Sequence, residues 1–115
     1  MEKFQIFRKS QSLFQYIRRY VIISIPKIHS TYRLKLDEYL ILLNENIIKA
    51  NLNVKNVRIR EKYQKEALSN IAMIELLIRI LKEEGIISGK RFLVVVNNLN
   101  EINKMLYGWI NEKER

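Results

Sequence analysis

Apolar residues recur at intervals of three and four along four separate segments of this 115-residue chain. That spacing places side chains on one face of an α-helix, which turns once every 3.6 residues. The pattern predicts helices over residues 4–24, 31–51, 55–84 and 89–111. The predicted apolar stripes are Phe7, Phe14, Ile17 and Val21, with Ser10 between them; Leu36, Leu40, Leu43, Ile47 and Ala50; Ala67, Ile71, Ile74, Ile78 and Leu81; and Phe92, Val95, Leu99, Ile102, Leu106 and Trp109.

The break between the first two helices is set by Pro26, the only proline of the chain. Proline lacks a backbone N–H and disfavours the α conformation of the residue before it. The first helix is therefore expected to end by residue 25. Ser30 and Thr31 follow shortly afterwards and are the expected N-cap residues of the second helix, because their hydroxyls can accept bonds from free N–H groups.

The other helix ends carry similar signals. Either Asn53 or Asn56 is expected to cap the third helix, and Ser88 is expected to cap the fourth. Gly85 stands where the third helix must stop, and glycine readily takes the left-handed conformation that ends many helices. The run of three valines at 94–96 would alone favour a strand, but the stripe that continues to Trp109 favours a helix.

Four amphipathic segments with short connections predict an all-α fold: an antiparallel up-down-up-down four-helix bundle that forms one domain over residues 1–115. Some apolar residues fall outside the stripes. They belong either to a wide core stripe or to a contact between subunits, and the pattern leaves both interpretations open. These residues are Ile22, Ile23, Ile41, Ile48, Ile86 and Val94.

Composition narrows the class of protein. The chain has no cysteine, which excludes disulfides and cysteine-based zinc sites and is compatible with a cytoplasmic location. Arginines and lysines interrupt the apolar residues of 4–25, so we expect no secretory signal there. No uncharged apolar run is long enough to predict a membrane-spanning helix.

Positive charge is the strongest compositional signal, with a formal net charge of +9. Residues 1–35 contain eight basic residues and one acid, and residues 55–65 contain five and one. Clustered positive charge is typical of proteins that bind polyanions, although solvated helix faces are the plainer explanation. Basic residues in the first turns of a helix also oppose its dipole, which favours an external anion as their partner.

Two candidate sets of nucleic-acid- or partner-binding residues follow from this charge pattern. In an up-down bundle the two sets lie at opposite ends of the molecule. The first surrounds the proline corner, and the second begins the third helix. They are Arg18, Arg19, Lys27, His29, Arg33 and Lys35; and Lys55, Arg58, Arg60, Lys62 and Lys65.

Catalytic and metal-binding patterns are missing from the sequence. His29 is the only histidine, so histidine pairs, His-based triads and the HExxH motif are excluded. Three scattered glycines form no phosphate-binding loop. Most aromatic residues fall in the helical stripes and are expected in the core, with Tyr32 beside the basic corner as the exception. We therefore expect no enzyme, no catalytic residue, no metal and no cofactor.

Four stretches together resemble the accessory variability determinant (Avd) family of diversity-generating retroelements. Residues 25–29 read Ile-Pro-Lys-Ile-His and are similar to the family's Phe-Pro-Lys-x-His turn between helices one and two. Residues 43–51 end in Ala-Asn like its second helix. Residues 77–88 resemble its Leu-Arg-Leu-x-x-x-x-Gly-Leu-Ile-Ser segment, and residues 101–110 its Glu-Ile-Gly-Arg-Met-Leu-Gly-Gly-Trp ending.

The chain departs from the family pattern at four positions. Ser30 replaces an arginine, and Leu34, Asn103 and Tyr107 each replace a glycine. The resemblance implies a non-enzymatic basic accessory protein that assembles as a ring-like homo-oligomer, a pentamer. It also implies binding of the retroelement's reverse transcriptase and of RNA or DNA, in support of mutagenic copying of a template repeat.

An alternative remains within the same four-helix-bundle superfamily. Proteins encoded by intervening sequences of 23S ribosomal RNA genes share the bundle, and a chain of that type would be a structural or interaction protein without a reverse-transcriptase partner. Two further classes are expected less: an enzyme that uses His29 or Glu83, and a peripheral membrane protein that binds through its arginine-rich first helix.

Overall fold

The computed structural model describes the backbone of residues 2–112 and the side chains of residues 5–112. Over this range the fold is all-α and has no strand. The four α-helices are α1 (Glu2–Tyr20), α2 (Ser30–Leu52), α3 (Val57–Glu83) and α4 (Gly89–Ile110), and the short 3₁₀ turns η1 (Ile22–Ser24) and η2 (Lys27–His29) join α1 to α2.

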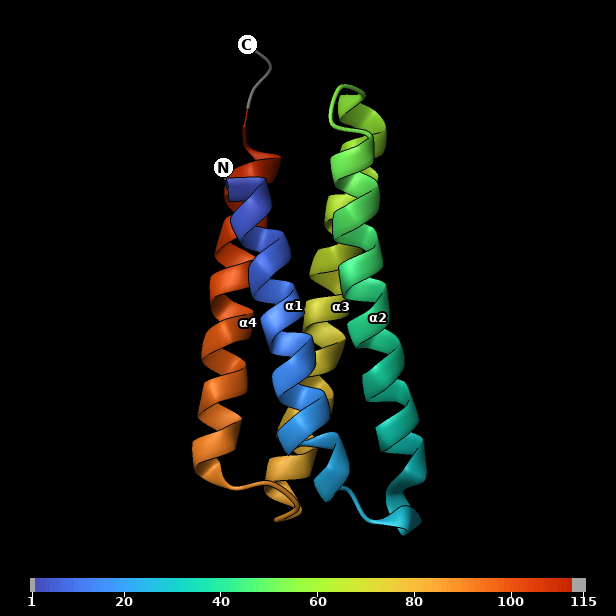
Figure 1. The fold of residues 1–115 in the computed structure, drawn as a ribbon, viewed down its shortest axis with the longest axis vertical. Helices are drawn as coiled ribbons and strands as arrows, with labels where there is room; N and C mark the ends of the chain where they lie inside the picture. The colour runs from blue at the N-terminus through green and yellow to red at the C-terminus, as the bar shows by residue number, and fades with distance from the viewer. Residues whose placement is uncertain (1, 113–115) are drawn as a thin grey trace.

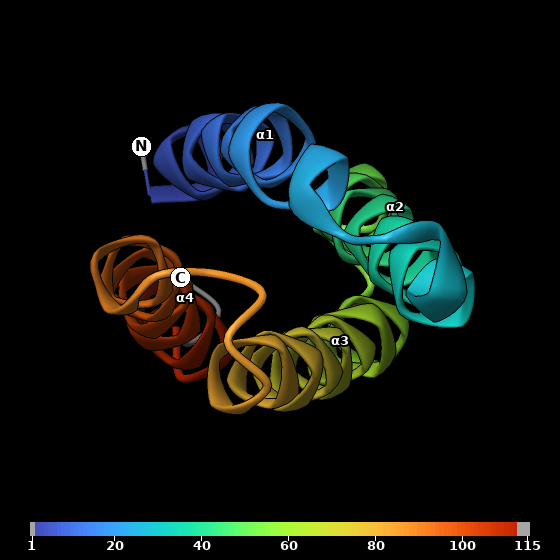
Figure 2. The same ribbon diagram turned by 90° about the horizontal axis from the view of Figure 1, so that it is seen from below.

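The helix packing is consistent with the predicted bundle. The molecule measures 49 × 23 × 19 Å, and the long axis follows the helices. The α1–α2 and α3–α4 connections lie at one end, while the α2–α3 connection lies at the other end, near the start of α1 (Figure 1). Viewed along the helices, α1, α2, α3 and α4 follow one another around the core (Figure 2).

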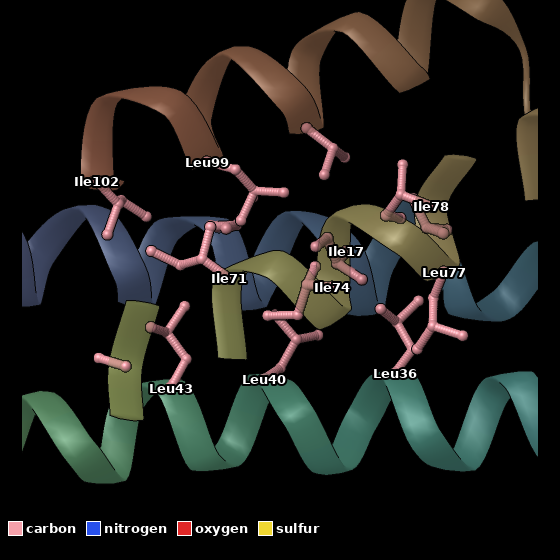
Figure 3. Packing of buried hydrophobic residues seen from close by; sticks show 14 of the residues in the cluster. Ile17, Leu36, Leu40, Leu43, Ile71, Ile74, Leu77, Ile78, Leu99 and Ile102 are labelled. Atoms are coloured by element: carbon pink, nitrogen blue, oxygen red, sulfur yellow. The ribbon is translucent and has the colours of Figure 1, made fainter. Parts of the chain in front are cut away.

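The apolar stripes predicted for α2, α3 and α4 are all buried. Their leucine and isoleucine side chains interlock between the helices along the middle of the molecule (Figure 3). On α1 the buried face lies slightly differently from the prediction. Ile6 and Leu13 are buried, whereas Phe7 and Phe14 only pack against the core from its edge.

The prediction that the first helix extends to residue 24 was wrong, because α1 ends at Tyr20. The N–H groups of Ser24 and Ile25 bond three residues back, which tightens the chain into η1. Ile25 is extended with ψ 122°, as expected of the residue before a proline. The Tyr20 carbonyl, left free by the tightening, accepts bonds from the Ser24 hydroxyl at 3.1 Å and from Arg91 Nη1 at 2.8 Å.

Neither Ser30 nor Thr31 caps α2, so this prediction was also wrong. The cap position is occupied by His29, and its side chain makes no capping hydrogen bond. The reason lies in η2. The N–H groups of His29 and Ser30 already bond to the carbonyls of Pro26 and Lys27, so the turn itself satisfies the first free donors of the helix.

At the remaining helix ends the predicted capping residues are confirmed. Asn56 accepts a bond from the Ile59 N–H at 3.2 Å, and Ser88 accepts one from the Arg91 N–H at 3.1 Å. Gly85 has φ 76°, the left-handed region that favours glycine. The Gly85 and Ile86 N–H groups bond to carbonyls of the last turn of α3, which is the Schellman arrangement.

Polar residues occupy part of the core on the side of the molecule nearest the α2–α3 connection. Asn46 donates to Asn70 Oδ1 at 2.7 Å, so one hydrogen bond joins these buried amides. Gln64 is fully buried, and neither its amide nitrogen nor its amide oxygen has a hydrogen-bond partner. Since buried unpaired polar groups cost stability, this end of the core is less favourable than the rest.

Candidate nucleic-acid interface

The predicted cations near Pro26 lie on α1, η2 and α2 at the end that holds the α1–α2 connection (Figure 1). The structure brings Arg18 and Arg33 together in one hollow of about 300 Å³ between α1 and α2. Arg18 is paired with Asp37 at 3.1 Å, whereas Arg33 has no acidic partner among the described residues. Arg33 is therefore the cation of this hollow that is available to an external anion.

The other cations of this first set differ in their environment. Arg19 and Lys27 are exposed, and neither forms an ion pair within residues 5–112. Lys35 lies 3.3 Å from Glu38 one turn further along α2. An exposed pair of this kind contributes little stability and opens at small cost, so Lys35 is partly neutralised but not withdrawn from the surface.

His29 is held by contacts inside the protein. Its ring stacks on Tyr32 with the centroids 5.5 Å apart, and its Nε2 lies 3.8 Å from a carboxylate oxygen of Glu84. The second contact connects the corner to the C-cap residue of α3. His29 and Tyr32 therefore contact each other at the corner where a partner surface is expected.

The second set begins in the α2–α3 connection with Lys55 and continues along α3. Arg58, Lys62 and Lys65 are spaced by four and three residues, are exposed, and share one helix face. None of these four cations has an acidic partner in the part of the chain that the structure describes. They form a basic stripe that runs down α3 from its first turn.

Next to this stripe, Tyr63 lies between two lysines. Lys62 Nζ is 5.3 Å and Lys49 Nζ is 5.5 Å from the centroid of its ring. Lys49 also bonds to Glu45 at 2.8 Å, and this hydrogen bond raises the pKa of Lys49. Lys49 is thus tied to α2, while Lys62 retains free N–H donors.

Arg60 does not belong to the exposed set, contrary to the prediction. Its side chain is only 6% exposed, and its Nη1 donates to the Val54 carbonyl at 3.3 Å. Residue 60 is in register with the stripe that continues through Gln64 and Ala67, so the helix period turns it toward the core. Arg60 fastens the α2–α3 connection from inside, and little of its side chain is accessible to a phosphate.

The sequence interpretation missed two basic residues, Lys90 and Arg91, which lie in the first turn of α4. They line a hollow with Tyr16 and Tyr20 of α1. The signal was present in the sequence, because cations in a first turn oppose the helix dipole here as they do in the third helix. We did not select them because two cations in a moderately basic segment do not stand out as a cluster of charge.

The two sets lie toward opposite ends of a molecule 49 Å long, as the bundle predicted (Figure 1). The Debye length at physiological salt is about 8 Å, so the sets act as separate electrostatic surfaces within one molecule. At 3.4 Å per base pair, a duplex of about 14 base pairs would be needed to follow the whole length of the chain.

Comparisons with known proteins identify no family for this chain. No protein-family model, no curated protein and no solved structure matches it. In the part of the chain that the structure describes, no helix is long and apolar enough to cross a membrane, and no group of three or more acidic or histidine side chains is placed to hold a metal ion.

Proposed function

We propose that this protein is a basic, non-enzymatic accessory protein that binds nucleic acid through phosphate contacts, of the type found in diversity-generating retroelements. One observation carries the proposal: seven cations at two places on the surface have no acidic partner among the described residues. They are Arg19, Lys27, Arg33, Lys55, Arg58, Lys62 and Lys65.

The absence of acidic partners matters because the same protein pairs other cations. Lys9, Arg18, Lys49 and Arg79 each lie against a carboxylate. Twelve acidic residues are available to 21 basic ones, and at the two basic sets they leave the positive charge largely uncompensated. Such surfaces bind phosphates by releasing condensed counterions, and phosphate contacts position a protein without reading base sequence.

The four family-like motifs support the retroelement assignment. The first forms the corner around Pro26, and the third ends α3 at Gly85 and leads to the cap of α4 at Ser88. These are the places where the family motifs are expected in an antiparallel up-down-up-down bundle, and the chain reversals at the two ends of the molecule agree with that topology. A reverse transcriptase is the proposed protein partner.

Exposed apolar residues on α2 support assembly into the proposed ring-like homopentamer. Leu34, Ile41 and Ile48 are spaced by seven residues and are 64%, 47% and 44% exposed. This stripe runs beside two hollows, one with Ile22 and one with Phe7 in its lining. Light scattering should show an oligomer that dissociates in Ile41→Glu. A wild-type monomer at micromolar concentration would contradict the ring.

Binding of nucleic acid is tested by removing the same charge from two kinds of cation. The double variant Arg58→Gln/Lys62→Gln loses two unpaired cations, whereas the control Lys9→Gln/Arg79→Gln loses two paired ones. Both variants change the net charge by the same amount. Fluorescence anisotropy with a labelled RNA hairpin should show weaker binding of the first variant and little change for the control. Equal affinities would refute the proposed interface.

The proposed partner is tested by searching the gene neighbourhood for a reverse transcriptase and co-expressing it with this protein. Co-purification that persists after nuclease treatment is the expected result. The intervening-sequence alternative predicts instead that the gene lies within a 23S ribosomal RNA gene and that no reverse transcriptase is encoded nearby.

A further inference from the structure

A hollow of about 620 Å³ opens between the last turns of α1 and the first turn of α4. Its volume is within the range of small-molecule binding sites. The lining combines the aromatic rings of Tyr16 and Tyr20 with the cations Lys90 and Arg91 and the apolar side chain of Val94, and it includes no carboxylate. The chemistry of the lining therefore suits a ligand that is flat on one part and negatively charged on another.

Tyr20 is the aromatic residue that this hollow leaves accessible. Most aromatic residues are expected in the core, but the side chain of Tyr20 is 39% exposed. Tyr20 is the last residue of α1, and the chain tightens into η1 shortly after it. Tyr16 packs beside it with the ring centroids 5.0 Å apart and the planes inclined by 49°.

The guanidinium of Arg91 lies over the Tyr20 ring and adds a second planar group to the hollow. The guanidinium lies 5.4 Å from the centroid of the Tyr20 ring, and its Nη1 donates to the Tyr20 carbonyl at 2.8 Å. These two contacts fix a planar cation before any ligand binds, so little side-chain entropy remains to be lost. Lys90 beside it is exposed and forms no ion pair within residues 5–112.

We propose that this hollow holds an unpaired nucleotide of a single-stranded nucleic acid. The base stacks on the surface formed by Tyr20 and Arg91, and the adjoining phosphate lies beside Lys90. Every base has a π face that stacks on tyrosine rings and guanidinium planes, so the site accepts bases with little selectivity. The inference rests on the proposed nucleic-acid binding and adds a preference for unpaired strands.

Other ligands use only part of this lining. A duplex keeps its bases stacked inside and presents phosphates alone, so it can engage Lys90 but not the ring of Tyr20. An acidic peptide likewise engages the cations without needing the aromatic surface. The contributions of the Tyr20 ring and of the positive charge to binding can therefore be separated by variants that remove one and keep the other.

The experiment compares a single-stranded oligouridine of about ten nucleotides, with 2-aminopurine at one internal position, with a duplex of equal length. The fluorescence of 2-aminopurine falls when it stacks on a protein ring. Tyr20→Ala removes the aromatic ring, whereas Tyr20→Phe keeps it. Arg91→Lys keeps the positive charge but removes the planar guanidinium group. Tyr107→Ala is the matched control, because Tyr107 is an exposed tyrosine of α4 outside the hollow.

Tyr20→Ala and Arg91→Lys should each weaken single-strand binding at least about fivefold and diminish the quenching, since stacking contributes roughly 1–3 kcal/mol per base. Tyr20→Phe and Tyr107→Ala should bind as the wild type does, and none of the Tyr20, Arg91 and Tyr107 variants should change duplex affinity. Lys90→Gln should reduce the salt slope for single strands by about 0.7. Circular dichroism establishes that each variant is folded.

Unchanged single-strand affinity and quenching in folded Tyr20→Ala would overturn the inference, as would an equal loss for single strand and duplex. In both cases the wild type still binds nucleic acid, so the proposed function stands. A wild type that binds neither probe overturns the proposed function and the inference together.

Discussion

Replacing Gln64 with leucine should stabilise the protein. Gln64 is fully buried on α3, and neither polar atom of its amide has a hydrogen-bond partner. A buried polar group without a partner costs roughly 1–3 kcal/mol. Leucine has a similar size and carries no polar atom, so we expect the free energy of unfolding to rise by about 1–3 kcal/mol.

A matched change at a paired amide should have the opposite sign. Asn70 is buried to a similar degree, but it accepts a hydrogen bond from Asn46 at 2.7 Å. Asn70→Leu removes that bond and leaves the Asn46 amide unpaired, so we expect a loss of about 1–3 kcal/mol. The contrast separates the effect of an unpaired amide from that of added apolar volume.

Urea unfolding followed by circular dichroism measures both changes. Protein concentration must be held fixed, because assembly would itself add stability. Gln64→Leu should raise the midpoint without changing the m-value, which would indicate a change of stability in the same two-state transition. If Gln64→Leu lowers stability while Asn70→Leu behaves as expected, the Gln64 amide makes bonds in solution that the structure does not show, and the reasoning fails.

Two further predictions concern helix ends and can be measured in the same way. Gly85→Ala should destabilise by about 1–2 kcal/mol, because φ is 76° there, while Gly89→Ala, in open space at the start of α4, should be neutral or slightly stabilising. Equal effects at the two glycines would contradict the Schellman ending of α3. Ser88→Ala should cost about 0.5–2 kcal/mol through loss of the bond to the Arg91 N–H, while Ser69→Ala on the exposed face of α3 should change little. A loss confined to Ser69→Ala would disprove the cap.

Much of the fold was predictable because helical periodicity is a local property. The stripes through Leu40, Ile74 and Leu99 are buried as predicted, and the cap residues Asn56 and Ser88 act as expected. Each of these signals depends on residues within one or two turns of the same helix.

The corner at Pro26 was predicted only in outline. The residue before the proline is extended as expected, but the sequence did not reveal two 3₁₀ turns. Those turns satisfy the backbone donors that Ser30 was expected to satisfy. Their existence depends on how α1 and α2 pack, and that packing is not encoded in the local pattern.

The candidate site was predicted less well than the fold. Residue type alone places Arg60 with the other cations of α3, yet the helix period turns it inward. Conversely, Lys90 and Tyr20 are far apart in the sequence and meet only because α1 ends where α4 begins. Charge patterns predict which segments are basic, but packing decides which cations remain exposed.

The salt dependence of RNA binding is the most direct test of whether the exposed cations bind phosphates. The measurement is the slope of the logarithm of the binding constant against the logarithm of NaCl concentration, for the wild type and for Arg58→Gln/Lys62→Gln/Lys65→Gln on one duplex. If these three exposed cations each neutralise a phosphate, the triple variant should have a slope shallower by about 2.7. A wild-type affinity that does not change with salt, or identical slopes for both proteins, would contradict the account.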